Sequence, residues 1–519
     1  MSSIQARFYK RWAQLKALLD NDPDEAVKQA LEINLDVPEP ERSNLMILRA
    51  STLVDGGALT QQHDAIEEGL ALFRDLHNRL PRADITYNLA NGLIAAAGSP
   101  PHGPNWLDHQ ERTREHRAEA RRCFWKVAQD PRADSALKTQ AWTNLANQFS
   151  ISYRLGEAHD AWLAALEIDP ENGVAASSAA HSLLWLYERG GCSDMTRIEA
   201  IMLAKIAHRH IDRAVEYAGA QAAEKITAFA RELEDSPSRS PHTDPFIEWV
   251  ERERLTLAPA VERIDPTLGK LDWLMLPGIL ERKFDTGVTP PPVFAMFNML
   301  KSDFVLARDL AWRAADESVW PTTGRFGDTL DYATYGPDVS ALILAHRTAL
   351  DLLDKIAVTA NHYFGFGQPP NRVTFGKLWR GNPDKVTGIR PLSDQVENVI
   401  RSGVSALYGL VELAEDYDNI AGILHSQKNL RNAGTHRFVV LHDFGDLEHI
   451  RQSPEIEHHR REQFTHEVLR ALRVARSAIQ MLALSISQHE HSLRQQTTGI
   501  VGSLLVPDHD WIRGRDDEV

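Results

Sequence analysis

"PRADSALKTQAWTNLANQFSISYRLGEAHDAWLAALEIDP", residues 131–170, contains two apolar faces with helical spacing on either side of a glycine. The first predicted helix carries its apolar residues on one face, and these are Trp142, Leu145, Ala146 and Phe149. Gly156 stands in the predicted turn, and the second helix, which ends before Pro170, is lined by Ala158, Trp162 and Ala165. Because alanine is small, the helices can approach closely at Ala146 and Ala158, while the aromatic side chains fill the groove of the next pair. The stretch therefore predicts a helical hairpin that packs against similar hairpins.

The same sequence words occur earlier in the chain, where "PRADITYNLANGL" begins at Pro81 and shares "PRAD" and "NLAN" with the first stretch. The bulky–small–bulky pattern, with its period of ~34 residues, resembles a tetratricopeptide repeat. The resemblance fits residues 139–172 best, and residues 83–131 less well because "GSPPHGPNWLDH" is inserted as a loop. Ser43–Asn78 and Ala175–Tyr217 are weaker flanking units. A generic array of helical hairpins is the alternative, and either one stacks into a solenoid whose concave face binds a partner.

The composition limits the classes of protein that fit. A chain of 519 residues is too long for one ordinary domain, and 43% hydrophobic with 25% charged residues is the composition of a soluble globular protein. The net charge of −15 argues against wholesale coating of nucleic acid or of an anionic membrane, but it leaves room for a local basic cleft. Only Cys123 and Cys192 are present, so a disulfide framework is excluded.

The expected location is the cytoplasm, with no membrane association. The first residues, "MSSIQARFYKRWAQLKALL", are interrupted by charges and lack the apolar core of a signal peptide. No uninterrupted apolar stretch is long enough to span a bilayer. The two cysteines also suit a reducing compartment.

The predicted fold is all-α, with an N-terminal helical solenoid followed by an antiparallel helical bundle. Breaks at "EDSPSRSPHTDP" and "DTGVTPPP" separate the two parts. Long periodic segments then follow, namely Val293–Ala315, Val339–His362, Leu392–Asp416 and Gln463–His491. The expected domains are a repeat domain (1–233), a linker with connecting helices (234–292), the bundle (293–492) and a tail (493–519).

A polar cluster precedes an apolar run in "KNLRNAGTHRFVVLHD", residues 428–443. Asn432 and His436 are four residues apart, so on a helix they share a face and the amide can orient the imidazole. Arg431 adjoins them, and the small residues between leave room for a phosphate to approach the backbone. These features make Arg431, Asn432 and His436 the candidate catalytic residues.

The spacing of Arg431 and His436, with four residues between them, carries little information by itself. The chain repeats this arginine–histidine spacing at three other places, namely Arg154/His159, Arg437/His442 and Arg461/His466. Arg154 and His159 fall in the turn of the best repeat, where a solvated role is expected. Between Arg437 and His442 lies "FVVL", a buried run with no room for a ligand. The composition around Arg431 is what distinguishes the first match.

Arg-Asn-x-x-x-His, late in a bundle of long helices, resembles the signature of the HEPN superfamily. The helix "LAHRTALDLLDKIAVTANHYFG" and the following "VTFGKLW" resemble one bacterial branch of it, and the similarity covers roughly residues 246–490. The resemblance implies a metal-independent endoribonuclease that acts as a homodimer, with two motifs meeting in one cleft and RNA as the substrate. It implies that His436 transfers a proton, Arg431 stabilises the charge of the phosphorane, and Asn432 orients or binds.

Those roles suit the residue types. A base near neutral pKa can take the proton of an RNA 2′-hydroxyl, which then attacks the neighbouring phosphate. A guanidinium presents a planar fork to phosphate oxygens and keeps its charge. The chemistry requires no metal or cofactor, and none is expected.

Other interpretations remain open. "KNLRNAGT" could be an ordinary helix C-terminus in which Gly434 is the left-handed cap, Asn432 bonds to carbonyls and His436 lies on the surface. The bundle could also serve as a non-catalytic scaffold or a nucleotide- or RNA-binding regulatory protein. A third possibility is a toxin neutralised by a partner. In the catalytic interpretation, the repeat array binds a protein or small-molecule trigger, as in bacterial stress-response, toxin or phage-defence effectors.

Further candidates are weaker. Arg347, Asp351 and Lys355 form a ladder at four-residue spacing, which is typical of a solvated helix face. Asp354 falls off that ladder within an apolar segment and is a candidate for facing the cleft. "EHH" at 457–459 and "HEH" at 489–491 suggest metal binding, but two residues of spacing separate the latter pair on a helix, and a solvated role is favoured for both.

Overall fold

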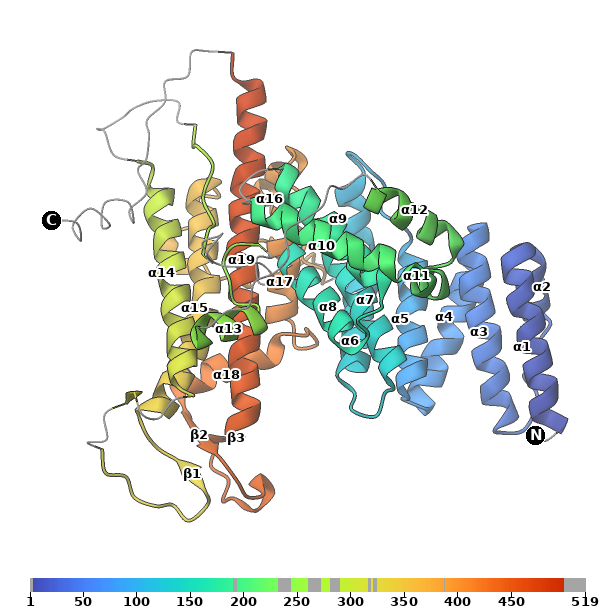
Figure 1. Ribbon diagram of the computed structural model, residues 1–519, viewed down its shortest axis with the longest axis horizontal. Helices are drawn as coiled ribbons and strands as arrows, with labels where there is room; N and C mark the ends of the chain where they lie inside the picture. The colour runs from blue at the N-terminus through green and yellow to red at the C-terminus, as the bar shows by residue number, and fades with distance from the viewer. Residues whose placement is uncertain are drawn as a thin grey trace.

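The computed structural model describes residues 3–189, 194–231, 244–259, 272–280, 290–315, 319–320, 324–386 and 388–498. It consists almost entirely of α-helices, which confirms the all-α prediction (Figure 1). The predicted breaks at 234–245 and 285–292 lie mostly outside these residues, and the end of the predicted tail, "GRDDEV", lies wholly outside them. Within the described residues, no helix combines the length and the apolar character needed to cross a bilayer.

Twelve helices of the described residues form the N-terminal array. They are α1 (Ser3–Asn21), α2 (Pro23–Leu31), α3 (Glu41–Thr60), α4 (His63–Arg79), α5 (Ala83–Ala97), α6 (Trp106–Gln129), α7 (Ser135–Ile151), α8 (Leu155–Ile168), α9 (Gly173–Glu188), α10 (Asp194–Arg209), α11 (Ile211–Ala218) and α12 (Ala220–Arg231). From α2 to α10 each helix packs against the next one, so the array extends sideways from the rest of the molecule (Figure 1). The carboxylate of Asp134 and the amide oxygen of Asn172 accept backbone N–H groups at the starts of α7 and α9.

The predicted hairpin is present as α7 and α8. Leu145, Ala146 and Ala158 are fully buried, which agrees with the close approach expected of the two alanines. Gly156, however, does not lie in the turn between these helices. It belongs to the first turn of α8, where an added Cβ atom would come within 2.6 Å of the Ser477 hydroxyl oxygen. This glycine is therefore required by the approach of a helix from the C-terminal bundle, which the local sequence does not reveal.

The C-terminal bundle contains α13 (Pro245–Arg252), α14 (Pro292–Arg313), α15 (Pro337–Tyr363), α16 (Asp394–Arg401), α17 (Leu407–Asp418), α18 (His425–His436) and α19 (Arg461–Gln496). The long helix α19 packs against α14, α15 and α17 and also against α8 of the array (Figure 1). One apolar core joins these helices, and Phe304, Leu353, Leu410, Leu472 and Ile479 are among its fully buried members.

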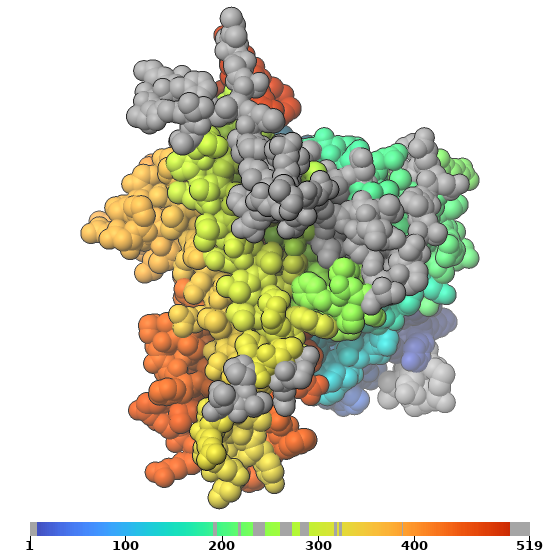
Figure 2. All heavy atoms as spheres, turned by 60° about the vertical axis from the view of Figure 1, so that its left-hand side comes forward, coloured from blue at the N-terminus to red at the C-terminus, as the bar shows by residue number. Residues whose placement is uncertain are grey.

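One prediction for the bundle was wrong in detail. Leu392–Asp416 is not one helix but two, α16 and α17, because Gly403 adopts a φ of +105° between them. The run after the polar cluster forms β2 (Phe438–His442), which pairs with β1 (Ala333–Thr334) and with β3 (Ile456–Arg460). β1 is antiparallel and β3 is parallel to β2. This small sheet projects from one end of the bundle, in yellow and orange at the bottom of Figures 1 and 2.

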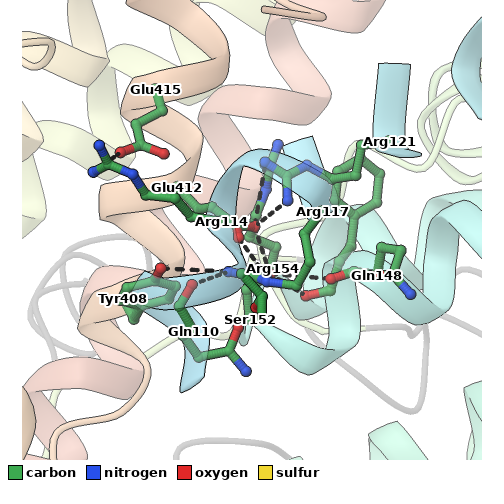
Figure 3. A network of polar contacts seen from close by, with 12 residues as sticks. Gln110, Arg114, Arg117, Arg121, Gln148, Ser152, Arg154, Tyr408, Glu412 and Glu415 are labelled. Carbon is green, nitrogen blue, oxygen red and sulfur yellow. Dashed lines mark hydrogen bonds and ion pairs between the residues drawn. The ribbon is translucent and has the colours of Figure 1, made fainter. Parts of the chain in front are cut away.

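The array and the bundle share a buried set of charged side chains, which we call the interdomain ion network (Figure 3). Its members are Arg117 and Arg121 of α6, Arg154 at the start of α8, and Glu412 and Asp416 of α17. Nη1 of Arg117 and Nη1 of Arg121 lie 2.6 and 2.9 Å from the carboxylate of Glu412. Arg154 and Arg121 both bind Asp416. The network therefore ties two segments of the array, α6 and the start of α8, to one helix of the bundle.

Arg154 is fully buried, so the expectation of a solvated Arg154 was wrong. Its guanidinium also binds Glu157 at 2.7 Å, and Ser152 donates its hydroxyl hydrogen to Glu412 at 2.6 Å. Burial alone would raise the pKa of Glu412, but the three arginines and Ser152 lower it to about 2. Glu412 therefore remains ionised at neutral pH inside the protein.

Candidate active site

The polar cluster occupies the last turns of α18. Arg431, Asn432 and His436 are all helical, and the helix ends at His436 because Arg437 is extended and the chain enters β2 directly. The N–H of Phe438 then donates to the Glu455 carbonyl at 2.8 Å. Gly434 lies inside the helix and has no positive φ, so the interpretation of this glycine as a left-handed cap was wrong.

The three side chains do not all leave the helix in the same direction. At about 100° per residue, Asn432 and His436 are separated by about 40° around the axis, whereas Arg431 lies about 140° from His436. The exposure agrees: Asn432 and His436 are exposed, and Arg431 is half-buried. Asn432 and His436 therefore share an open face, while Arg431 is directed toward the rest of the bundle.

Arg431 is held by two carboxylates of α15. Its Nε atom lies 2.8 Å from Oδ1 of Asp351, and its Nη2 atom lies 2.9 Å from Oδ2 of Asp354. Asp354 is itself fixed, because it accepts the backbone N–H of Phe375 at 2.8 Å. Asp354 thus faces the motif, as its position off the predicted ladder suggested. The guanidinium is oriented, but its charge is offset by two nearby acids.

The predicted surface ladder on α15 is only partly formed. Nε of Arg347 lies 3.8 Å from Asp351, which is a weak ion pair between exposed groups. Lys355, however, binds Asp303 of α14. Asp351 is therefore shared between Arg347 and Arg431, and this contact was missed because the two arginines come from separate helices.

Tyr417 of α17 also adjoins the guanidinium. Burial raises the pKa of its hydroxyl, and the positive charge of Arg431 offsets only part of that rise. For Arg431, burial favours a lower pKa, but Tyr417, Asp351 and Asp354 together raise it. The guanidinium therefore stays charged. A buried tyrosine at the end of a largely apolar helix gives no sequence signal of this contact.

The first half of α18 is anchored through Gln427. Its amide oxygen lies 2.8 Å from Nε2 of His346, and its amide nitrogen binds Glu467 of α19. His346 of α15 is almost completely buried, and burial lowers its pKa to about 4, although the Gln427 contact opposes this shift. The contact joins α15, α18 and α19 through polar side chains and holds α18 in place ahead of the motif.

Asn432 and His436 of the motif lie on an exposed face of α18. A hollow of about 590 Å³ lies between α14, α15 and the start of α19, and Leu342, Arg461 and His466 are among the residues that line it. None of the three motif residues contributes to that lining. An open site accepts a long, flexible polymer more readily than it encloses a small metabolite.

Residues 284–489 match the family model of the LA2681-like HEPN domain. The match covers α14 to α18 and most of α19, so it includes the whole motif and confirms the resemblance drawn from Arg431, Asn432 and His436. A comparison with curated proteins gives no match. The C-terminal part of the chain therefore matches a HEPN domain, which suggests a role connected with RNA cleavage or with nucleotides.

Proposed function

We propose that this protein is an endoribonuclease of the HEPN type whose repeat array controls its activity. The observation that carries the proposal is the grouping at the end of α18: an exposed imidazole and an exposed amide one turn apart, next to an arginine whose orientation is already fixed. The RNase-type role implied by a HEPN domain supports it.

The proposed step is cleavage by the neighbouring 2′-hydroxyl of the RNA. The 2′-oxygen forms a bond to phosphorus, the bond from phosphorus to the 5′-oxygen breaks, and the products are a 2′,3′-cyclic phosphate and a 5′-hydroxyl. His436 transfers the proton, Arg431 stabilises the extra negative charge of the phosphorane, and Asn432 orients the imidazole or the substrate. The step passes through no metal ion.

The positions of Arg431 and His436 support a site made from two copies of the chain. Within one protomer these side chains leave α18 in different directions, and Asp351 and Asp354 offset the positive charge of Arg431. A second copy would supply another guanidinium and another imidazole at the same phosphate. In such a site, Asp351 and Asp354 would keep their ion pairs with Arg431 and orient its guanidinium toward the phosphate.

The interdomain ion network supports control by the array. Asp416 binds Arg121 and Arg154 through its side chain, and its carbonyl oxygen accepts the N–H of Leu424 at 3.0 Å, directly before α18 begins. A trigger that shifts α6 or α8 would therefore act on the residues that position α18. This link is the physical route proposed from the sensor to the motif.

The test uses the purified full-length protein and a pool of structured and single-stranded RNAs. Cleavage should leave 5′-hydroxyl ends, which polynucleotide kinase labels without prior phosphatase treatment. Expression in a bacterium should also slow growth, because a host can supply a trigger that the purified protein lacks. RNA that stays intact in both settings would contradict the proposal.

A non-catalytic scaffold is the second candidate function. The observation that favours it is the pairing of Arg431 with two carboxylates, since such an ion pair also serves to fix one helix against another. If the protein is a scaffold, expression of the wild type and of a variant that lacks the His436 imidazole should slow growth equally, or neither should slow it. Only an RNase loses its toxicity when the imidazole is removed.

A further inference from the structure

The small sheet beyond α18 brings together two histidines and an aspartate that the motif does not use. His442 ends β2, His458 lies in β3, and Asp331 comes shortly before β1. One donor atom from each of the three lies within 4.8 Å of the other two. The strand register accounts for this, because β2 pairs with β3 at Val440↔His458 and with β1 at His442↔Ala333. His442 and His458 are therefore diagonal neighbours on one face of the sheet.

The orientation of the His442 ring identifies its donor atom. Its Nδ1 atom lies 2.9 Å from the carbonyl oxygen of Asp331, which can only accept, so Nδ1 carries the hydrogen. In the neutral ring Nε2 then holds a lone pair, and this atom lies 2.9 Å from Nδ1 of His458. Histidines that bind metals typically donate their other ring N–H to a carbonyl or carboxylate in this way. Because His442 is fully buried, packing keeps the ring in place.

The Asp331 carboxylate is also oriented by its surroundings. One of its oxygens, Oδ1, accepts the hydroxyl hydrogen of Thr329 at 2.5 Å and the N–H of Ala333 at 3.2 Å. The side chain is therefore held beside the two imidazoles by the strand that it precedes. Three different segments of chain thus each contribute one oriented donor.

We propose that Asp331, His442 and His458 bind a divalent zinc-type cation. Two imidazoles and one carboxylate are a donor set that suits Zn²⁺. Tetrahedral ligands at 2.0–2.1 Å from the ion lie roughly 3.3 Å apart, so the two ring nitrogens, now 2.9 Å apart, must separate by only a few tenths of an ångström. When the ion binds, Nδ1 of His458 gives up its hydrogen and Nε2 takes one up, so the imidazole stays neutral.

The ion would cross-link β2 and β3 to the segment before β1. β2 begins two residues after His436, so the bound ion would hold the chain in place where it leaves α18. The role is structural and stands apart from the proposed cleavage step. It would also change two expectations drawn from the sequence. A ligand would bind at the end of the apolar run, at His442, and His458 of "EHH" already lies beside another histidine and not in solvent alone.

The test titrates ZnCl₂ into the full-length protein after chelation and dialysis, followed by calorimetry. The wild type should bind one Zn²⁺ per chain at this site and unfold at a higher temperature with zinc than without it. His458→Ala and Asp331→Asn should each weaken binding by more than the roughly 10–100-fold that loss of a second-shell partner costs. His459→Ala, at the next position of the same strand, is the matched control and should bind as the wild type does.

Cobalt gives an independent readout. Co²⁺ in the wild type should show the visible absorption of a tetrahedral nitrogen and oxygen site, and His458→Ala should lack it. Asp331 and His458 are only partly buried, so their variants should fold, and circular dichroism checks this. The proposal fails if the wild type binds no zinc, or if wild type and a folded His458→Ala bind it equally, as scattered surface histidines would.

Discussion

His436 and Arg431 stand close in sequence but are held very differently. The imidazole is exposed at the end of a helix, whereas the guanidinium is fixed by Asp351 and Asp354. Because the His436 side chain contributes little to packing, replacing it should leave folding almost unchanged. A loss of cleavage in such a variant would then report on the reaction and not on stability. At this scale the two residues can be tested separately.

His436→Ala should lower RNA cleavage by about 10²–10⁴-fold, because a general acid–base group is lost. Its thermal stability should stay within about 0.5 kcal/mol of wild type, because the side chain is exposed. Cleavage rates and thermal melts on the same preparation measure both. His449→Ala, at an exposed histidine of the following loop, should leave both quantities unchanged. Equal cleavage by wild type and His436→Ala would exclude a catalytic role.

Arg431→Lys should lower cleavage by at least about tenfold, although it preserves the positive charge. A lysine cannot bind Asp351 and Asp354 as a planar fork and present the remaining nitrogen to phosphate. Single-turnover rates on one defined RNA measure this. The matched control is Arg347→Lys, in the exposed pair with the same Asp351, which should cleave as wild type does. If both variants cleave normally, the fork geometry has no part in the reaction.

At the scale of elements, α18 depends on the helices around it. Gln427 joins it to His346 of α15 and to Glu467 of α19, and Ala433 is fully buried. The end of the helix that carries the motif therefore projects from an anchored base. This arrangement makes the stability of the bundle depend on keeping His346 neutral.

Acidification should destabilise the protein between about pH 6.5 and 4. The pKa of His346 is lowered to about 4 in the folded state from 6.5, so in this window the unfolded state binds more protons and stability falls as the pH falls. The loss amounts to about 3 kcal/mol at most, since one pKa unit corresponds to 1.36 kcal/mol. Denaturant unfolding at pH 7, 5.5 and 4.5 measures it. His346→Gln should lose less stability over the same range, and parallel curves for the two proteins would contradict the assignment.

At the scale of the whole molecule, the array and the bundle are joined by buried charges as well as by apolar contacts. Arg117, Arg121 and Arg154 surround Glu412 (Figure 3). The carboxylate of Asp416, which binds Arg121 and Arg154, completes the interdomain ion network. Loss of one member of such an interface is costly, because a buried charge is left without the partner that offset it. Without Glu412, Arg117 would lose the carboxylate that it binds, whereas Arg121 and Arg154 would keep Asp416. The two parts are therefore expected to respond as one unit.

Glu412→Ala should destabilise the protein by about 3–5 kcal/mol, because three buried guanidinium groups lose their shared carboxylate. Asp309→Ala removes a carboxylate from the exposed Asp309–Arg313 pair of α14 and should cost no more than about 1 kcal/mol. Urea unfolding of both variants gives the comparison. If the two substitutions cost the same, the buried network contributes nothing beyond an ordinary surface pair.

The sequence alone determined the features that repeat within a few residues. Helical periodicity predicted α7, α8, α14, α15 and α19, and the residues around Arg431 indicated the HEPN domain. The sequence alone could not predict that Arg431 binds Asp351 and Asp354, that Arg154 is buried, or that His442 lies beside His458. Periodicity is encoded within one or two turns of a helix, whereas these contacts join segments far apart along the chain. Which charges meet there depends on which faces of the helices and strands pack together, and only the tertiary structure decides that.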